Sequence, residues 1–411
     1  MEERIILHCD CNNFFASCEC LQNPSIKDKP VVVAGSSEER KGVVLAKNYI
    51  AKKFGIYTGM RVYEAERVCK DLVVVPPRMK LYNEYSLKVK EIYTRFTDMV
   101  EAFSIDECFL DVTHSKMFGT GTQIADKIRE LVKKELGLTI SVGVSFCKVF
   151  AKIGSDLKKP DATTEITKEN FKTIVWNLPV GDMIGVGKQT REKFEKLAIS
   201  TIGDLANFPL TMLESRLGKV GKDLWSYANG QDNRIVAKYY DKPIPKSIGN
   251  SATFYRDLKN RDEVLMALEA IAESVASRMI KQDIGKAETL HLVVKNSELN
   301  VFQKQCKLVQ PCRNAKIFAH TAYNLFNAFY DFKQNVRLLG ISVSNFLNDD
   351  EQLNLFEQEE KQNLDEVVVA LRDKFGNHSI GRASGLLDTK IYSSLSRAEF
   401  FKEIKDCDDE F

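Results

Sequence analysis

The stretch Phe103-Ser104-Ile105-Asp106-Glu107-Cys108 sets two adjacent acids inside an apolar run. Val100 precedes this stretch, and Phe109, Leu110 and Val112 follow it. The pattern predicts a pair of strands with the acids close to the turn that joins them. A carboxylate buried among apolar side chains costs free energy unless a cation neutralises it. The pattern is therefore compatible with a divalent cation beside the acids, and a strand-end acid with an exposed acidic turn is the alternative.

A third acid follows an apolar run near the start of the chain. The run Arg4-Ile5-Ile6-Leu7-His8-Cys9 predicts a strand that leads directly into Asp10. A two-metal site for phosphoryl or nucleotidyl transfer needs carboxylates that converge from different strands. Asp10, Asp106 and Glu107 supply those carboxylates if the fold brings them together. If it does not, Asp10 is an ordinary acid at the end of a strand.

Length and composition indicate a soluble protein of several domains. The chain has 411 residues, which predicts about three or four domains. Apolar residues make up 44% and charged residues 28%, as in ordinary globular proteins. No segment approaches about 18 uninterrupted apolar residues, so we expect no membrane span. The N-terminus has no signal-peptide pattern, so we expect a cytoplasmic, nucleoid-associated protein.

The ten cysteines are predicted to be reduced. Cys9 with Cys11 and Cys18 with Cys20 form C-x-C pairs, which is not the usual C-x-x-C spacing of a zinc knuckle. Disulfides are unusual in cytosolic proteins, and a reduced cysteine packs as a small apolar residue. A zinc site on these pairs is the alternative.

Charge is unevenly distributed along the chain, although the net charge is only +2. Residues 242–345 hold 15 Lys and Arg against 9 Asp and Glu, and residues 346–411 hold 8 against 16. A basic module followed by an acidic tail suits a body that binds a polyanion and a separate C-terminal interaction segment. A chance asymmetry of a solvated surface is the alternative.

Strand and helix patterns alternate up to about Pro160, which predicts an α/β catalytic half. From there to Gly230 the pattern predicts mostly short helices with Gly-rich turns. Pro243 and Pro245 lie among charges in a predicted linker. After the linker a βαββαβ-like pattern predicts an α+β module, which includes a helix from Ala315 to Phe329.

Two aromatic residues, Phe14 and Phe15, stand one helical turn beyond Asp10. A flat ring at this place could stack under the sugar of a bound nucleotide and leave no room for a 2′-hydroxyl. Packing in the hydrophobic core is the alternative for both rings.

Basic residues near the acids are candidates for binding phosphate. Tyr49 and Lys52 are three residues apart on a predicted short helix, so they share one face. A hydroxyl and an ammonium on that face can clamp a triphosphate. Lys159, near the end of the catalytic half, could reach the same phosphates. Ordinary basic helix surfaces are the alternative.

The run Ile184-Gly185-Val186-Gly187-Lys188 resembles the hairpin of a helix-hairpin-helix motif. Gly185 and Gly187 permit a tight turn whose backbone N–H groups face a phosphate. A looser copy of the motif lies around Gly218 and Gly221. Each copy would grip the DNA backbone without reading its sequence.

The run Gln352-Leu353-Asn354-Leu355-Phe356 lies in an acidic, low-complexity stretch. A few apolar anchors on a flexible tether are typical of a docking peptide. A short helix packed back on the body is the alternative.

Taken together, these runs resemble the Y family of DNA polymerases, the translesion class that includes DNA polymerase IV and UmuC-type proteins. The resemblance extends from about Ile5 to about Phe346. The runs that carry it agree in order and spacing and are Ser104-Ile105-Asp106-Glu107, Asn48 to Gly55, Lys148 to Lys152 and Ser247-Ile248-Gly249.

The resemblance implies a multidomain α/β fold shaped as a right hand. Its parts would be a palm, fingers, a helical helix-hairpin-helix thumb, an α+β little finger that binds DNA and an acidic C-terminal tail with a clamp-binding peptide. The expected ranges are 1–10 with 75–165 for the palm, 11–74 for the fingers, 166–232 for the thumb, 233–245 for a linker, 246–346 for the little finger, 347–411 for the tail and 352–356 for the peptide.

The resemblance also implies roles for single residues. Asp10, Asp106 and Glu107 match the catalytic, metal-binding acids, and the carbonyl of Cys11 matches a backbone ligand. The expected cofactor is Mg²⁺, two ions per site, with Mn²⁺ able to substitute. Phe15 matches the steric gate, with Phe14 beside it. Tyr49, Lys52 and Lys159 match contacts to the deoxynucleotide, although Lys52 stands where many members have arginine and lacks its bidentate fork.

The implied partners are primer-template DNA, a deoxynucleoside triphosphate and the β sliding clamp. The candidate DNA contacts are Gly185, Gly187, Lys188, Gly218, Gly221 and Ser247. The candidate clamp contacts are Gln352, Leu353, Leu355 and Phe356. We expect the protein to be a monomer.

The expected function is low-fidelity, template-directed DNA synthesis past lesions, without proofreading. The predicted fingers hold few large apolar residues beyond Tyr49, Phe54 and Met60, which fits a loose site. Two alternatives stay open: a nucleotide cyclase with a palm-like fold, and a catalytically silent regulator that binds DNA and the clamp.

Overall fold

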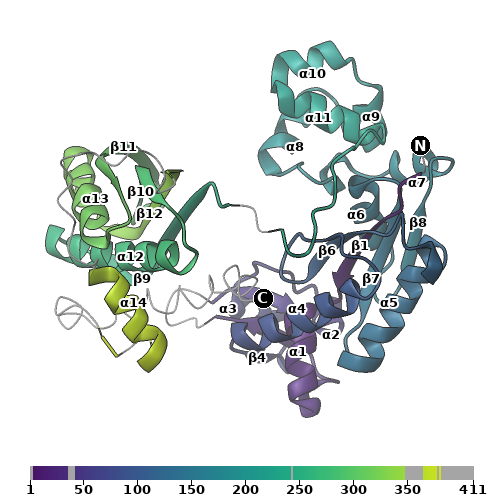
Figure 1. Cartoon of the computed structure of the whole chain (residues 1–411), viewed down its shortest axis with the longest axis horizontal. Helices are drawn as coiled ribbons and strands as arrows, with labels where there is room; N and C mark the ends of the chain where they lie inside the picture. Colours follow the sequence, from purple (N-terminus) through teal and green to yellow (C-terminus); the bar gives the residue numbers. More distant parts are fainter. Residues whose placement is uncertain (1–2, 36–41, 242–243, 348–363, 377–378, 381–411) are drawn as a thin grey trace. The chain divides into compact units, whose positions relative to one another are not determined.

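The computed structural model describes residues 3–35, 42–241, 244–347, 364–376 and 379–380 (Figure 1). It comprises two compact units, which are described separately here. The first unit is Met1–Ala34 with Val44–Asp241, and the second is Gly35–Val43 with Lys242–Phe411. The predicted clamp-binding residues Gln352, Leu353, Leu355 and Phe356 lie outside the described residues.

A five-stranded sheet forms the centre of the first unit. Its strand order is β5 (Val100–Ala102), β6 (Glu107–Asp111), β1 (Ile6–Cys11), β7 (Ile140–Ser145) and β8 (Thr163–Ile166). Strands β7 and β8 are parallel, and the other neighbours are antiparallel. The predicted hairpin around Asp106 is therefore present as β5 and β6.

Helices cover both faces of this sheet. Side chains on a strand alternate between the faces, so neighbouring residues of β7 contact different helices. Gly143 lies so close to Ala151 of α6 (Lys148–Leu157) that an added Cβ would be 1.9 Å from the Ala151 carbonyl oxygen. The next residue, Val144, lies against Gly121 of α5 (Gly121–Leu136), on the opposite face. Helix α4 (Met79–Thr94) packs beside α5.

Local sequence signals explain the bounds of α5. The Thr120 side chain caps the first turn by accepting a hydrogen bond from the Gln123 backbone amide. In return, the Gln123 side-chain oxygen accepts a hydrogen bond from the Thr120 backbone amide. Gly137 ends the helix in the left-handed conformation. Ile124 and Ile128 on one face are fully buried.

The predicted fingers contain a three-stranded sheet in the order β3 (Val44–Lys47), β2 (Val31–Ala34) and β4 (Val73–Val75). The Asn48 side chain caps α2 by accepting from the Ala51 amide. The helices of this region are α1 (Phe14–Gln22), the 3-10 turn η1 (Pro24–Ile26), α2 (Tyr49–Lys53) and α3 (Val62–Val68).

The predicted thumb consists of short helices around a core that includes Phe194 and Leu213. Its helices are α7 (Phe171–Val175), α8 (Lys188–Glu195), α9 (Ile202–Asn207), α10 (Leu210–Leu217) and α11 (Lys219–Ala228). Gly185 has a φ of +89°, and Gly187 is the residue immediately before α8, as a tight turn at a helix start requires.

The second predicted hairpin is wrong at Gly221. This residue lies inside α11, where an added Cβ would be 2.7 Å from the Leu213 carbonyl oxygen, and its amide donates to Gly218. The Gly218 amide donates to Glu214. Both amides therefore have backbone partners, and Gly221 serves the close packing of α11 on α10 instead of a turn, while the contacts of Gly218 and Gly221 with DNA stay a prediction.

Much of the predicted linker 233–245 is fixed to the palm. Asp232 accepts a hydrogen bond from the Val149 amide at the start of α6. Lys148 donates to Glu101 at 2.6 Å and to the Ile235 carbonyl at 2.7 Å. Val236 is fully buried. The sequence pattern missed this attachment because its partners lie about 80 to 130 residues away along the chain.

The second unit is a four-stranded antiparallel sheet in the order β11 (Val301–Cys312), β10 (Lys286–Asn296), β12 (Val336–Leu347) and β9 (Ser247–Leu258). Helices α12 (Arg261–Lys281) and α13 (Ala315–Phe329) pack with it around one hydrophobic core. The core includes the fully buried Phe254, Phe318 and Phe326. The predicted bounds of α13 are confirmed, and the predicted α+β module is present.

Helix α14 (Leu364–Phe375) lies in the predicted acidic tail and packs on α12. The Asp365 carboxylate accepts from the Ala315 amide at 2.8 Å, so it caps the start of α13. Arg372 forms a largely buried ion pair with Glu273 at 3.2 Å, and Val369 is buried. This part of the tail therefore belongs to the fold of the second unit, which the sequence analysis did not predict.

We expect Arg372→Ala to lower the free energy of opening of α14 by about 3 kcal/mol, because the substitution removes a largely buried ion pair between Arg372 and Glu273. Amide hydrogen exchange of the full chain measures this. The matched control is Lys281→Ala, which removes the exposed pair of Lys281 with Asp373 and should cost about 1 kcal/mol or less. Equal effects of the two substitutions would contradict the predicted role of the Arg372 pair.

No helix in the described ranges is both long and apolar enough to cross a bilayer. The nine cysteines within the described ranges form no disulfide.

Candidate active site

The register of β1 and β6 brings the predicted acids together. Asp10 is the direct cross-strand partner of Glu107, and His8 is the partner of Phe109. Directly opposed residues on antiparallel strands have Cβ atoms about 5 Å apart. Because side chains alternate, Asp10 and Glu107 lie on the same face as Gly143, the face that α6 covers.

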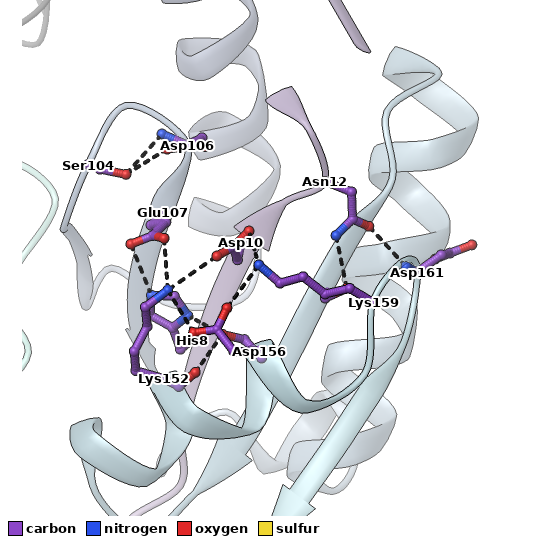
Figure 2. Close-up of polar contacts among 12 residues, drawn as sticks. His8, Asp10, Asn12, Ser104, Asp106, Glu107, Lys152, Asp156, Lys159 and Asp161 are labelled. Atoms are coloured by element: carbon purple, nitrogen blue, oxygen red, sulfur yellow. Dashed lines mark hydrogen bonds and ion pairs between the residues drawn. The ribbon is translucent and has the colours of Figure 1, made fainter. Parts of the chain in front are cut away.

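Asp106 stands at the turn that leads into β6. Its backbone carbonyl accepts from the Cys11 amide at 3.0 Å, which joins the ends of the two strands. Its carboxylate accepts from the Ser104 hydroxyl at 2.7 Å (Figure 2). The structure therefore places all three acids and the Cys11 backbone at one end of the palm sheet. Their metal-binding role stays a prediction.

Two lysines contact the acids, one on α6 and one just after the end of that helix. Lys152 of α6 contacts Glu107 at 2.8 Å and Asp10 at 3.2 Å, and Lys159 contacts Asp10 at 2.9 Å (Figure 2). Both ammonium groups also contact Asp156, at 3.3 and 2.9 Å. The sequence analysis assigned no role to Lys152 or Asp156, although their spacing of four residues on one helix face was a usable signal.

These contacts decide the protonation of the site. Burial raises the pKa of Asp10, but Lys159 and Lys152 outweigh it, and the net shift is downward. Burial raises the pKa of Glu107 to about 7, although Lys152 opposes the shift. Burial raises the pKa of Asp106, and the Ser104 hydrogen bond opposes it. Burial alone would lower the pKa of Lys152, yet Asp10 and Glu107 raise it.

His8 lies beneath Glu107 and is fully buried. The Ser155 hydroxyl donates to the Lys152 carbonyl, so it accepts from His8 Nδ1 at 2.8 Å, and that nitrogen carries the proton. Burial and then Lys152 lower the pKa of His8 well below its usual value, so the ring is neutral. Its Nε2 has no hydrogen-bond partner among the described residues and lies 3.8 Å from Glu107 Oε2.

Four of the predicted nucleotide contacts lie on two helices of the predicted fingers: Phe14 and Phe15 on α1, and Tyr49 and Lys52 on α2. The half-buried Phe15 ring stacks on Tyr82, with centroids 4.3 Å apart and planes 11° apart. Phe14 is only 2% exposed, so its side chain packs in the core, and its predicted contact with the nucleotide stays a prediction. Burial raises the pKa of Tyr49, and Lys159 and Asp10 are the charges that act on it. Lys52 Nζ lies 5.9 Å from the centre of the Tyr49 ring.

The donor set at this end of the sheet fits a hard divalent cation. Carboxylate and carbonyl oxygens are the ligands that Mg²⁺ and Mn²⁺ prefer. In the described ranges, no three His, Cys, Asp or Glu side chains are arranged as a metal site. The three acids do not form a metal site as they stand, because their carboxylates have other partners. Asp106 accepts a hydrogen bond from Ser104, and the two lysines form ion pairs with Asp10 and Glu107.

The remaining predicted DNA contacts are widely spaced along the chain. Gly185, Gly187 and Lys188 lie at the start of α8 in the thumb. Ser247 is the exposed first residue of β9, in the second unit. Their contact with DNA stays a prediction.

Comparison with known proteins identifies the family. Residues 9–156 match the impB/mucB/samB family, residues 245–355 match its C-terminal domain, and residues 181–232 match the thumb domain of DNA polymerase iota. DNA polymerase IV of Acetivibrio thermocellus is 46% identical, over 94% of this chain and 98% of that protein. DNA polymerase IV 2 of Bacillus subtilis (strain 168) is 37% identical, over 94% and 95%. A solved Y-family DNA polymerase chimera superposes with a TM-score of 0.74 and 25% identity, over 84% of this chain and 99% of that one.

The chain belongs to the Y family of DNA polymerases. This confirms the predicted family and the right-hand fold class. The Y-family match also implies that the chain depends on a divalent metal. The domain boundaries predicted within the family fold, and the roles of single residues, stay predictions.

Proposed function

We propose that this Y-family chain is a DNA-directed DNA polymerase for translesion synthesis, which adds deoxynucleotides to a primer 3′ end without proofreading. The observation that carries the proposal is the cross-strand pairing of Asp10 with Glu107, with Asp106 beside them. Strands far apart in the chain supply these acids at one point, as nucleotidyl transfer requires.

Two Mg²⁺ ions would be held by the carboxylates of Asp10, Asp106 and Glu107 and by the backbone carbonyl of Cys11. When bound, such ions lower the pKa of a primer hydroxyl and stabilise charge on the transferred phosphate. Asp10 could offer both of its carboxylate oxygens to bound cations, because each oxygen already has its own cationic partner, Lys152 or Lys159.

The remaining residues of the site bind and orient the nucleotide. Lys159 can exchange Asp10 for a triphosphate oxygen, because its side chain is 27% exposed and its charge acts on Tyr49. Lys52, on the same helix as Tyr49, adds a second charge. The Phe15 ring would lie beneath the sugar as a steric gate, so a 2′-hydroxyl would clash with it.

DNA is held by its backbone in this proposal. The turn at Gly185, Gly187 and Lys188 and the strand that starts at Ser247 contact phosphates. Affinity should therefore fall steeply with salt. The clamp-binding peptide makes the β sliding clamp a partner, and we propose a monomer associated with the nucleoid.

The deciding experiment is extension of a labelled primer on a template, with all four deoxynucleotides and Mg²⁺. Templated extension supports the proposal. A chain that binds primer-template DNA but does not extend it would be a silent regulator. Cyclisation of a nucleotide without any template would indicate the cyclase alternative.

Changing Leu355 and Phe356 together to alanine is expected to remove stimulation by the clamp, because the peptide loses its apolar anchors. Synthesis without the clamp should stay within about twofold of wild type, since neither residue belongs to the predicted catalytic, nucleotide-binding or DNA-binding set. Primer extension with and without loaded clamp measures both activities. The matched control is Asn354→Ala, and loss of both activities in the double variant would mean that the segment is structural.

A further inference from the structure

Two residue pairs interlock where α1 packs on α4. Phe15 and Glu19 are four residues apart on one face of α1. Arg78 and Tyr82 have the same spacing at the start of α4, where Arg78 is the residue before the first turn. Phe15 stacks on Tyr82, and Glu19 contacts both Arg78 and Tyr82.

Glu19 is the centre of this arrangement. Its Oε1 accepts from the Tyr82 hydroxyl at 2.6 Å and from Arg78 Nε at 3.0 Å. Its Oε2 accepts from the Arg78 terminal nitrogen at 2.5 Å. The residue is only 2% exposed. Charge-assisted hydrogen bonds to a buried carboxylate are strong and directional, so Glu19 fixes the buried Tyr82 hydroxyl and also binds Arg78, whose side chain is 48% exposed.

Tyr82 transmits this anchoring to Phe15. Its side chain is fully buried, and burial and then the Glu19 hydrogen bond raise its pKa, so the hydroxyl remains a donor. A Tyr82 ring held at both its packed face and its hydroxyl cannot tilt freely. The Phe15 ring stacked on it at 11° is therefore held in one plane.

We infer that Glu19, acting through Tyr82, is a positioning residue that sets discrimination against ribonucleotides. This inference rests on the proposed function, in which Phe15 is the steric gate. A gate excludes a 2′-hydroxyl only if its ring cannot move aside. Loss of the Glu19 carboxylate would let Tyr82 and Phe15 tilt together and make room for the hydroxyl.

The test measures kcat and KM for a deoxynucleotide and for the matching ribonucleotide in the full-length enzyme. Glu19→Gln is expected to lower the ratio of the two kcat/KM values about tenfold, the usual effect of losing a hydrogen bond to a charged group. The deoxynucleotide constants should stay within about twofold, since the gate does not clash with that sugar. Tyr82→Phe, which keeps the ring and its packing, should act in the same direction.

The double variant Glu19→Gln/Tyr82→Phe should be no worse than the stronger single variant, because both remove the same contact. The matched control is Glu135→Gln, which removes the bidentate partner of Arg95 at the other end of α4 and should leave the ratio unchanged.

Each other outcome has a defined meaning. Equal losses for both sugars, together with a lower melting temperature, would make Glu19 a purely structural residue and overturn the inference. An unchanged ratio in Glu19→Gln, with a lower ratio in Phe15→Ala, would overturn the inference and leave the gate intact. An unchanged ratio in Phe15→Ala would instead remove the gate on which the inference rests.

Discussion

Replacing Asp106 by alanine is expected to reduce primer extension at least about a thousandfold, since a lost metal ligand removes several kcal/mol of transition-state stabilisation. Asp106 carries a half-buried carboxylate at the turn before β6, and its backbone already joins the ends of β1 and β6. Alanine keeps that backbone hydrogen bond and removes only the side chain. Single-turnover extension with Mg²⁺ and a saturating deoxynucleotide measures the effect.

The control is a carboxylate of the same unit outside the cluster. Asp98→Ala removes an exposed side chain paired with Lys238 at 3.6 Å and should leave extension within about twofold. Binding of primer-template DNA should survive in both variants, because its contacts lie elsewhere. Extension that persists in Asp106→Ala would remove the two-metal assignment while leaving the family assignment in place.

Phe15→Ala is expected to lower discrimination against ribonucleotides about a hundredfold, since relief of a steric clash is worth up to about 3 kcal/mol. The half-buried Phe15 ring lies flat on Tyr82, so its truncation opens space at the nucleotide face. The ratio of kcat/KM for a deoxynucleotide to that for the matching ribonucleotide measures the effect.

The neighbouring Phe14 is the natural control for this prediction. Its side chain is 2% exposed, so Phe14→Leu should lower the melting temperature and leave the sugar ratio unchanged. If Phe14→Leu changed the ratio as much as Phe15→Ala, the effect would come from general loosening of α1. An unchanged ratio in Phe15→Ala would refute its role as the gate.

Features that depend on neighbouring residues were predictable from the sequence. The acidic hairpin, the strand that leads into Asp10 and the bounds of α13 follow from patterns of apolar residues a few positions apart. Helix α5 follows from its capping residues and Gly137. Gly221 was misjudged because a glycine required by close packing looks like a glycine required by a turn.

Features that depend on distant contacts were not predictable. The contacts of Ile235 with Lys148 and of Asp232 with Val149, and the docking of α14 through Arg372, involve partners remote in the chain. The same holds for the network of Glu19, Arg78 and Tyr82, whose members are about 60 residues apart. No local pattern distinguishes such residues from ordinary surface charges.

The sequence by itself determined which groups are available for chemistry: three acids at strand ends, two aromatic residues beyond the first, and basic residues at helical spacing. Local hydrogen bonding and side-chain alternation suffice for that, because they act over a few residues. Only the tertiary structure decided that Asp10 faces Glu107, that Lys152 and Lys159 neutralise them, and that Phe15 rather than Phe14 faces outward. Strand register and helix packing set those relations, and both depend on burial summed over the whole fold.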